Sequence, residues 1–235
     1  MTYPSPTVDE LRAAFRDHGC TLVEVRGCAS RFRYLWQHGL RAIVDHHTAG
    51  VGDGVMAYME NRSGRYPFCN SSVRRNGEVW VFAYGSAWGS GDGTWPGTPK
   101  VWADDLLHEV AWQTEVESMG QVRDFTDVQL EALGRQNAAL VDLGVPAENE
   151  VNHRDWAPTR KVDTRYDAAF LRANTARYVI GDDMALSDDD VQRIAEAVWT
   201  RVVDADGDKK MGALLRATYL NTRKSTEVVA PPAEG

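Results

Sequence analysis

Residues 152–163 read NHRDWAPTRKVD, so a histidine, a lysine and an aspartate share one short stretch that a proline interrupts. Pro158 lacks a backbone donor and clashes with the preceding turn, so His153 and Asp163 are not expected to be neighbours on one helical face. A loop can still bring both side chains to one point. A solvated surface loop has the same charged composition, so this stretch alone leaves both interpretations open.

A pair of histidines ends the apolar run RAIVDHHTAG, in which a strand is expected over residues 42–44. The strand end presents His46 or His47, and the pattern does not choose between them. A catalytic zinc site needs three protein ligands and an open position for water, and two histidines with one carboxylate form a known set. His46, His153 and Asp163 could therefore bind one zinc ion.

A base for such a site is offered by EVAWQTEVES, whose alternation predicts a strand with Glu115 and Glu117 on its polar face. Glu115 is the candidate that takes a proton from the water that the metal activates. Each of these residues is weak evidence alone, because single histidines and strand glutamates are more often structural or solvated.

Other catalytic and metal-binding motifs are incomplete or missing in this sequence. HEVAW at 108–112 lacks the second histidine of HExxH, and DADGDKK at 204–210 lacks the glycine spacing and final glutamate of a calcium loop. The sequence contains no GxSxG elbow, phosphate loop or dinucleotide fingerprint.

The elements that must position these residues alternate between helix and strand. Helices are expected over 8–19, where Gly19 is the C-terminal stop, from the Thr126 cap to Gly144, and from Tyr166 onwards. A strand is expected from Thr21, and Asn76-Gly77 predicts a tight hairpin turn between two β-prone runs. A segment rich in glycine and proline, 85–102, carries three tryptophans and is expected to form a binding rim.

The composition excludes several classes of protein. A net charge of −8 disfavours a nucleic-acid binder, and no apolar run approaches the roughly 20 residues that a bilayer span needs. Three cysteines do not form an even disulfide framework. The N-terminus shows no secretory signal, so we expect the protein to stay at first in the cytoplasm.

Five segments carry a resemblance to a known family: IVDHHTAG, RRNGEVWV, AWGSG, WQTEVES and NHRDWAPTRKVD, in that order. The chain resembles the zinc-dependent N-acetylmuramoyl-L-alanine amidases of the Amidase_2, or peptidoglycan recognition protein, type, and more narrowly a phage endolysin. The resemblance runs from about His18 to Tyr178. It implies an α/β fold in which helices flank a central mixed β-sheet, with a catalytic domain over residues 1–180.

The resemblance also implies roles for residues. His46, rather than His47, falls on the first zinc ligand, and His153 and Asp163 fall on the other two. Glu115 falls on the proton shuttle, and Lys161 on the lysine that stabilises the oxyanion. Substrate contacts are expected from three further residues: Thr48, Trp88 and Arg160.

Two departures from the family pattern bear on the substrate site. Gly89 stands where many relatives have a histidine, and Cys69 lies near a position where many have tyrosine. Trp95 and Tyr84 are hypothesised to flank a substrate groove with Trp88, and core packing is the alternative for all three.

The implied reaction is cleavage of the amide between N-acetylmuramic acid and L-alanine of the stem peptide in bacterial peptidoglycan. An endolysin would remain in the host cytoplasm until a holin releases it for host lysis. A bacterial recycling or sporulation amidase is an alternative of the same chemistry. A catalytically inactive peptidoglycan-recognition module is the main rival, and a metal nuclease, prompted by VDHH, is the third hypothesis.

The composition shifts beyond Gly181, where residues 187–202 have the apolar spacing of an amphipathic helix. We expect residues 181–235 to form a helical C-terminal appendage that ends in a frayed tail. Wall targeting, self-association through these helices, and structural capping are three roles that the sequence leaves open.

Overall fold

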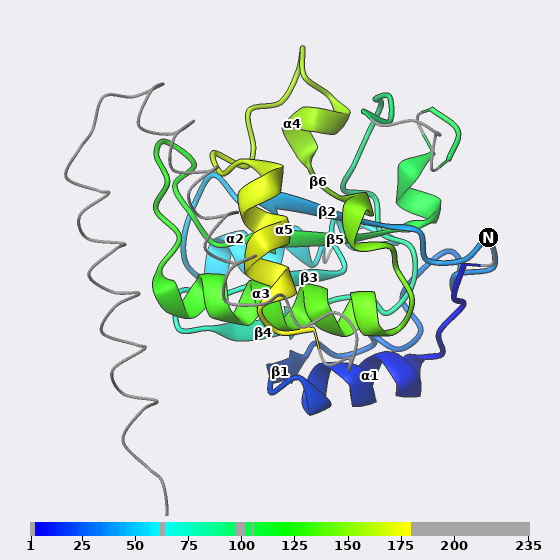
Figure 1. Cartoon of the computed structure of the whole chain (residues 1–235). Helices are drawn as coiled ribbons and strands as arrows, with labels where there is room; N and C mark the ends of the chain where they lie inside the picture. Colours follow the sequence, from blue (N-terminus) through cyan, green and yellow to red (C-terminus); the bar gives the residue numbers. More distant parts are fainter. Residues whose placement is uncertain (1–2, 62–63, 97–101, 105, 180–235) are drawn as a thin grey trace, which may run out of the picture. The chain divides into compact units, whose positions relative to one another are not determined.

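A six-stranded mixed sheet forms the centre of the protein in the computed structural model, which describes residues 3–61, 64–96, 102–104 and 106–179 (Figure 1). The strand order is β1-β4-β3-β5-β2-β6. β3 and β4 pair antiparallel, and the other neighbours pair parallel. The strands are β1 (Thr21–Glu24), β2 (Ala42–His47), β3 (Ser71–Val73), β4 (Glu78–Val81), β5 (Ala111–Val116) and β6 (Glu150–Asn152).

Helices flank this sheet, and the expected fold class is confirmed. α3 packs against both α1 and α5 (Figure 1). The α-helices are α1 (Val8–Asp17), α2 (Asp53–Met59), α3 (Asp127–Asp142), α4 (His153–Trp156) and α5 (Ala168–Ala176), and two short 3-10 helices are η1 (Leu107–Glu109) and η2 (Ala147–Asn149). The predicted C-terminal appendage, 181–235, lies outside the described residues. None of the described helices has the length and apolar character to cross a membrane.

Local sequence signals account for the ends of these elements. Thr126 caps α3 with a capping box, as the sequence predicts, and Thr7 caps α1 in the same way. Gly144, just beyond α3, has φ 100°, a conformation that favours glycine. Gly77 likewise has φ 83° in the turn that joins β3 to β4, so the predicted hairpin is confirmed.

Side chains alternate between two buried faces along β2 and β5. Ile43 and Trp112 belong to the larger core cluster, which also contains residues of α1, α3 and α5. Val44 and Ala111 belong to a second cluster on the opposite face of the sheet. The predicted polar face of β5 is therefore buried rather than solvated, and Gln113 on this face has no exposed surface, because β5 is an inner strand of the sheet.

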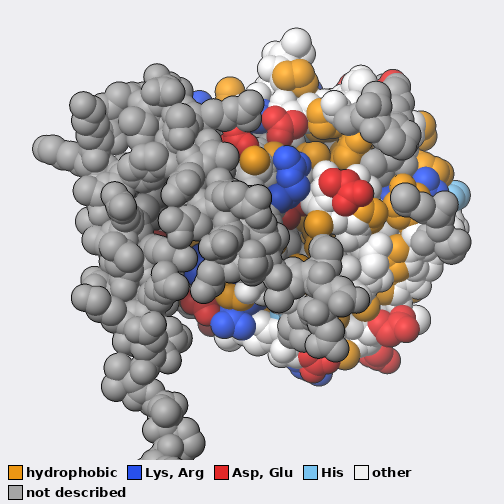
Figure 2. Space-filling view, in the orientation of Figure 1, with side chains coloured by type: hydrophobic (Ala, Val, Ile, Leu, Met, Phe, Trp, Pro, Cys, Tyr) orange, Lys and Arg blue, Asp and Glu red, His pale blue; other side chains and the backbone are white. Residues whose placement is uncertain are grey.

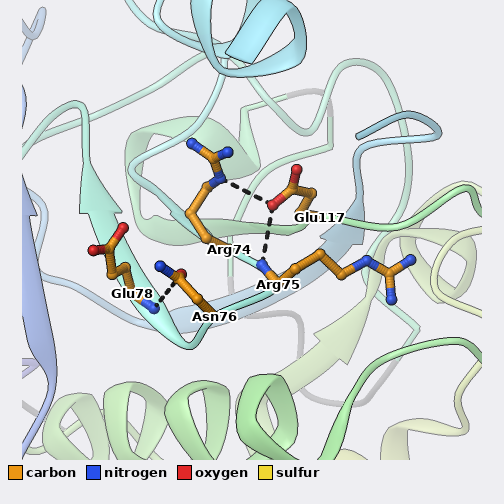
Figure 3. A pocket seen from close by; sticks show the side chains of 5 residues that line it. All are labelled: Arg74, Arg75, Asn76, Glu78 and Glu117. Carbon is orange, nitrogen blue, oxygen red and sulfur yellow. Dashed lines mark hydrogen bonds and ion pairs between the residues drawn. The ribbon is translucent and has the colours of Figure 1, made fainter. Parts of the chain in front are cut away.

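Glu117 joins three segments just beyond the end of β5. Its carboxylate accepts hydrogen bonds from the Arg75 backbone N at 3.0 Å and from Arg74 Nε at 2.9 Å (Figure 3). It also accepts a hydrogen bond from the Gly52 backbone N at 2.5 Å. Together with Asn76 and Glu78, these arginines and Glu117 line a pocket at the β3–β4 turn. Burial would raise the pKa of Glu117, but the three donors outweigh it and hold the pKa below its ordinary value.

Glu117→Gln is expected to reduce the free energy of unfolding at neutral pH by about 1.5–3 kcal/mol, the usual range for hydrogen bonds to a charged group. Because the folded-state pKa is depressed, this stabilisation is present above the ordinary glutamate pKa and is lost as the pH falls through the folded-state value. Urea unfolding across that pH range should show the difference shrinking towards acid. The control is Glu131, an exposed residue that forms a surface ion pair with Arg135. Glu131→Gln should change the free energy of unfolding little. Equal losses at both sites would contradict the prediction.

Candidate metal centre and active site

Three potential metal ligands converge at the carboxyl ends of neighbouring parallel strands. His46 lies near the end of β2, His153 opens α4 directly after β6, and Asp163 follows in the next loop. The two Nδ1 atoms are 2.7 Å apart, and Asp163 Oδ2 lies 3.0 Å from His153 Nδ1 and 3.4 Å from His46 Nδ1. All three side chains are buried. The ends of parallel strands are a common place for ligand sites in α/β sheets.

Strand alternation places His46, and not His47, in this cluster. His46 pairs in register with Glu115 of β5, so the two side chains emerge on the same face of the sheet. The next residue, His47, points to the other face, where Gly120 leaves room for its ring. The structure thus resolves the choice that the strand pattern left open.

Backbone and side-chain hydrogen bonds hold the segment between His153 and Asp163 in a closed loop. The Arg154 backbone N donates to the Asp163 carbonyl at 2.6 Å. Asn152 Nδ2 donates to the Tyr166 carbonyl at 3.0 Å, and Asn152 Oδ1 accepts from the Thr164 hydroxyl at 2.6 Å. The stretch predicted as a loop begins with the four-residue helix α4, which ends before Pro158.

Hydrogen bonds determine which ring nitrogens are available to a metal. His153 Nε2 lies 2.9 Å from the Ser90 carbonyl, an acceptor, so it carries the proton. His46 Nε2 lies 2.8 Å from Gln113 Oε1 and donates to it. When both rings are neutral, both Nδ1 lone pairs face the Asp163 carboxylate. This arrangement is repulsive unless a proton or a metal cation lies between the three atoms.

The electrostatics of the cluster agree with this geometry. Burial lowers the pKa of His46, but Asp163 and Glu115 outweigh burial and the pKa is raised. Burial and then the neighbouring His46 lower the pKa of His153 to about 4. Burial would raise the pKa of Asp163, yet the two histidines hold it far below its ordinary value. The cluster therefore favours one positive charge between two imidazoles and an ionised carboxylate.

Glu115 is the partly buried acid beside this cluster. Its Oε2 atom is shielded from solvent and has no hydrogen-bond partner among the described residues. Burial raises its pKa to about 7, and His46 and Lys161 oppose that rise. A carboxyl group with a pKa near neutrality can both accept and return a proton.

Lys161 lies within electrostatic reach of the same centre. The side chain is half-buried, and its positive charge lowers the pKa of both Glu115 and His153. The loop 157–166 thus brings an ammonium group to the site, where it can stabilise a negative charge on a substrate oxygen.

Comparison with known families shows which family this chain belongs to. A profile of the family described as N-acetylmuramoyl-L-alanine amidase (Amidase_2) matches residues 37–166, more than half of the chain and a span that contains every cluster residue. The chain belongs to this amidase family. The resemblance inferred from the five sequence segments is therefore confirmed. A search of curated proteins finds no match to the chain.

A solved structure with a fold similar to that of this chain is AmpD. A selenomethionine derivative of AmpD has a TM-score of 0.51 and 18% identity, over 74% of this chain and 99% of that chain. E. coli AmiD in complex with a muramoyl peptide substrate has 24% identity and a TM-score of 0.44, over 53% of this chain and 52% of that one. This chain thus spans about half of that AmiD chain. The Ph2119 endolysin of a Thermus scotoductus bacteriophage has 16% identity and a TM-score of 0.44, over 66% of this chain and 98% of that chain.

The three residues expected to contact substrate lie in different environments. Trp88 is 45% exposed, and its ring stacks on His108 with centroids 4.6 Å apart. The Thr48 hydroxyl donates to the Gly50 carbonyl at 2.6 Å and accepts from the Ser118 backbone N at 3.1 Å, so it ties the ends of β2 and β5 together.

Arg160, the third of these residues, supports the loop that contains Ser90 and Asp92. Its Nη2 atom donates to the Asp92 carbonyl at 2.5 Å and to the Ser90 carbonyl at 3.2 Å. Since Ser90 also accepts from His153, Arg160 contacts the same carbonyl as the histidine.

Two aromatic residues proposed for the groove are core residues. Tyr84 has no exposed surface and packs near Trp112, with ring centroids 6.3 Å apart, and Trp95 is 7% exposed in the second core cluster. The hypothesis that they flank substrate is wrong, because an aromatic-rich loop can bury its own rings against the sheet. Cys69 is also buried, and burial, followed by the negative charge of Glu115, raises the pKa of its thiol.

The sequence analysis missed two polar residues of the site, Gln113 and Ser90. Gln113 precedes Glu115 by two positions, so the period of a strand places both on one face. That signal was sufficient to find Gln113. Ser90 lies in an irregular loop, and nothing in its neighbouring residues indicates that its carbonyl meets His153.

Figure 2 shows one face of the molecule, on which basic side chains stand beside acidic and hydrophobic ones in the part that the structure describes. The described residues of this face present no continuous basic stripe of the kind that binds a phosphate backbone.

Proposed function

We propose that this chain is a zinc-dependent amidase that hydrolyses the bond between N-acetylmuramic acid and L-alanine of the peptidoglycan stem peptide. The observation that carries the proposal is the convergence of His46 Nδ1, His153 Nδ1 and Asp163 Oδ2 in a buried cluster whose outer nitrogens are already hydrogen-bonded. Membership of the N-acetylmuramoyl-L-alanine amidase family supports the substrate and the bond.

The donor set fits zinc better than magnesium or calcium. Two imidazole nitrogens and one carboxylate suit zinc, whereas magnesium and calcium prefer a shell of oxygen atoms. Three protein ligands leave a position open, as catalytic zinc sites do. When bound there, zinc supplies a Lewis acid and lowers the pKa of water.

The residues around the cluster have complementary tasks in the proposed reaction. Glu115 accepts a proton from the water that adds to the amide carbonyl carbon, and then donates it to the leaving nitrogen of L-alanine. Lys161 holds its ammonium group where it can stabilise the negative charge that develops on the carbonyl oxygen. Trp88 presents an exposed ring that can pack on the apolar face of a sugar or on the peptide.

We also propose a biological setting. The protein acts as a phage endolysin that remains in the host cytoplasm until a holin releases it to the cell wall. The motifs that resemble endolysins support this setting. In this proposal residues 1–180 are the catalytic domain, and residues 181–235 are the candidate segment for self-association.

Purified peptidoglycan provides the test. Zinc-loaded protein is expected to reduce the turbidity of a wall suspension and to release new L-alanine amino groups, while a chelator should abolish both signals. Added zinc should restore the activity, and added magnesium should not. Wall binding without release of amino groups would favour the inactive recognition module, and degradation of plasmid DNA with magnesium or manganese would favour the nuclease.

A further inference from the structure

Gln113 links the two histidines of the cluster through a hydrogen-bonded chain. It has no exposed surface, and its Oε1 accepts from His46 Nε2 at 2.8 Å. At its other end, Gln113 Nε2 donates to the Ser90 hydroxyl at 2.5 Å. Both amide atoms of this buried side chain are therefore used inside the site.

Ser90 completes the link with its backbone. Its carbonyl accepts from His153 Nε2 at 2.9 Å, so the chain runs from His46 through Gln113 and Ser90 to His153. The two rings meet again at their Nδ1 atoms, 2.7 Å apart. The four residues form a closed ring of polar contacts, which includes the two Nδ1 atoms proposed to bind the metal.

Other contacts hold this ring in place. Asn70 Oδ1 accepts from the Gln113 backbone N at 2.9 Å, and Asn70 Nδ2 donates to two carbonyls of the loop after β4. Arg160 Nη2 donates to the Ser90 carbonyl on the opposite side. The sheet and the loop are thereby fixed to each other at the metal centre.

Gly89 allows the loop to approach so closely. A Cβ atom at this position would lie 2.7 Å from the Phe68 carbonyl oxygen and 3.1 Å from Gln113 Oε1. The first distance is too short for a real contact with backbone, so any side chain here would push the loop, and Ser90 with it, away from Gln113. Gly89, which stands where many relatives have a histidine, thus permits the contact between Ser90 and Gln113.

We propose that Gln113 and Ser90 are positioning residues that hold both imidazoles with Nε2 protonated and Nδ1 free for the metal. This inference rests on the proposed metal centre. A partner that accepts from the outer N–H of a ligand histidine fixes its tautomer and ring orientation, and losing such a partner typically costs about 10–100-fold in metal affinity. Here one buried glutamine side chain and one serine serve both ligands.

Gln113→Met tests the inference. The variant is expected to bind zinc about 10–100-fold more weakly than the wild type in a competition with a chromophoric chelator. It should also change the visible spectrum of the cobalt-substituted protein, because the His46 ring is no longer held. Imidazole nitrogen shifts of the metal-free protein should show Nε2-protonated rings in the wild type and a changed tautomer population for His46 in the variant.

Gln136→Met is the matched control. Gln136 also has no exposed surface, and it bridges the Ser71 and Thr114 hydroxyls at 2.7 Å each on the other face of the sheet. This variant should lower thermal stability without altering zinc affinity or the cobalt spectrum. Equal zinc affinity in wild type and Gln113→Met would overturn the inference and leave the proposed function standing. A wild type that binds no zinc would contradict both.

Two milder variants keep the test decisive if Gln113→Met does not fold. Gln113→Glu retains an acceptor for His46 Nε2, and the Ser90 hydroxyl can turn to donate to the new carboxylate, so zinc affinity should stay close to that of the wild type. Ser90→Ala removes the hydroxyl but keeps the carbonyl, so it should weaken zinc binding less than Gln113→Met does. A loss in Gln113→Glu as large as that expected for Gln113→Met would contradict the positioning role.

Discussion

His153→Ala is expected to abolish release of L-alanine amino groups from peptidoglycan and to weaken zinc binding by more than about 100-fold, the upper range for residues that merely support a ligand. The ring has two buried partners, Asp163 Oδ2 at 3.0 Å and the Ser90 carbonyl at 2.9 Å, and both would lose their contact. Zinc competition and the wall assay should be measured on the same preparation.

His18→Ala is the matched control for this prediction. His18 is also buried, at 6% exposure, and its ring contacts the Ala14 carbonyl and Asp142, neither of which belongs to the cluster. Its removal should lower stability and leave zinc affinity unchanged. Retained activity in His153→Ala, or equal zinc loss in His18→Ala, would refute the ligand assignment.

Glu115→Gln is expected to reduce turnover by about 10²–10⁴-fold, the usual contribution of a general acid or base. Zinc affinity should change much less, because Glu115 accompanies the cluster without being one of its three members. Thermal stability should be unchanged or higher, since the variant removes a buried carboxyl whose Oε2 has no hydrogen-bond partner among the described residues. Loss of activity together with a gain in thermal stability would show that Glu115 serves the reaction and not the stability of the fold.

Glu150→Gln is the control for this prediction, because Glu150 is a buried acid outside the metal cluster. Burial also raises the pKa of Glu150, which contacts Asn137 and Thr175 on the helix-covered face of the sheet. Its replacement should affect stability more than turnover. If Glu115→Gln keeps wild-type turnover with zinc bound, the proton transfer must use another group, and the proposed role of Glu115 fails.

Much of the framework follows from rules that act over a few residues. The Thr126 cap, the end of α3 before Gly144 and the Asn76-Gly77 turn are decided by backbone geometry and neighbouring side chains, so the sequence alone predicts them. The strand before His46 has a clear apolar pattern. The ligand set itself came from a resemblance in several segments, and the cluster in the structure contains the same three residues.

The tertiary structure decided what depends on contacts between distant segments. The direction of the His46 side chain, which the strand pattern left open, rests on register with Glu115, and the partial burial of Glu115 rests on the place of β5 inside the sheet. Periodicity shows which residues share a face, but it does not show what covers that face. The expectation of an exposed groove for Tyr84 and Trp95 failed for this reason.

The sequence by itself thus determined the residue types for the chemistry and the local elements that carry them. Only the folded chain showed that Ser90 and Gln113 complete the surroundings of the two histidines, from 63 residues before His153 and 67 residues after His46. The physical reason is that helix caps and turns are settled by short-range geometry. A hydrogen bond from a ring nitrogen to a loop carbonyl exists only after packing has brought remote backbone together.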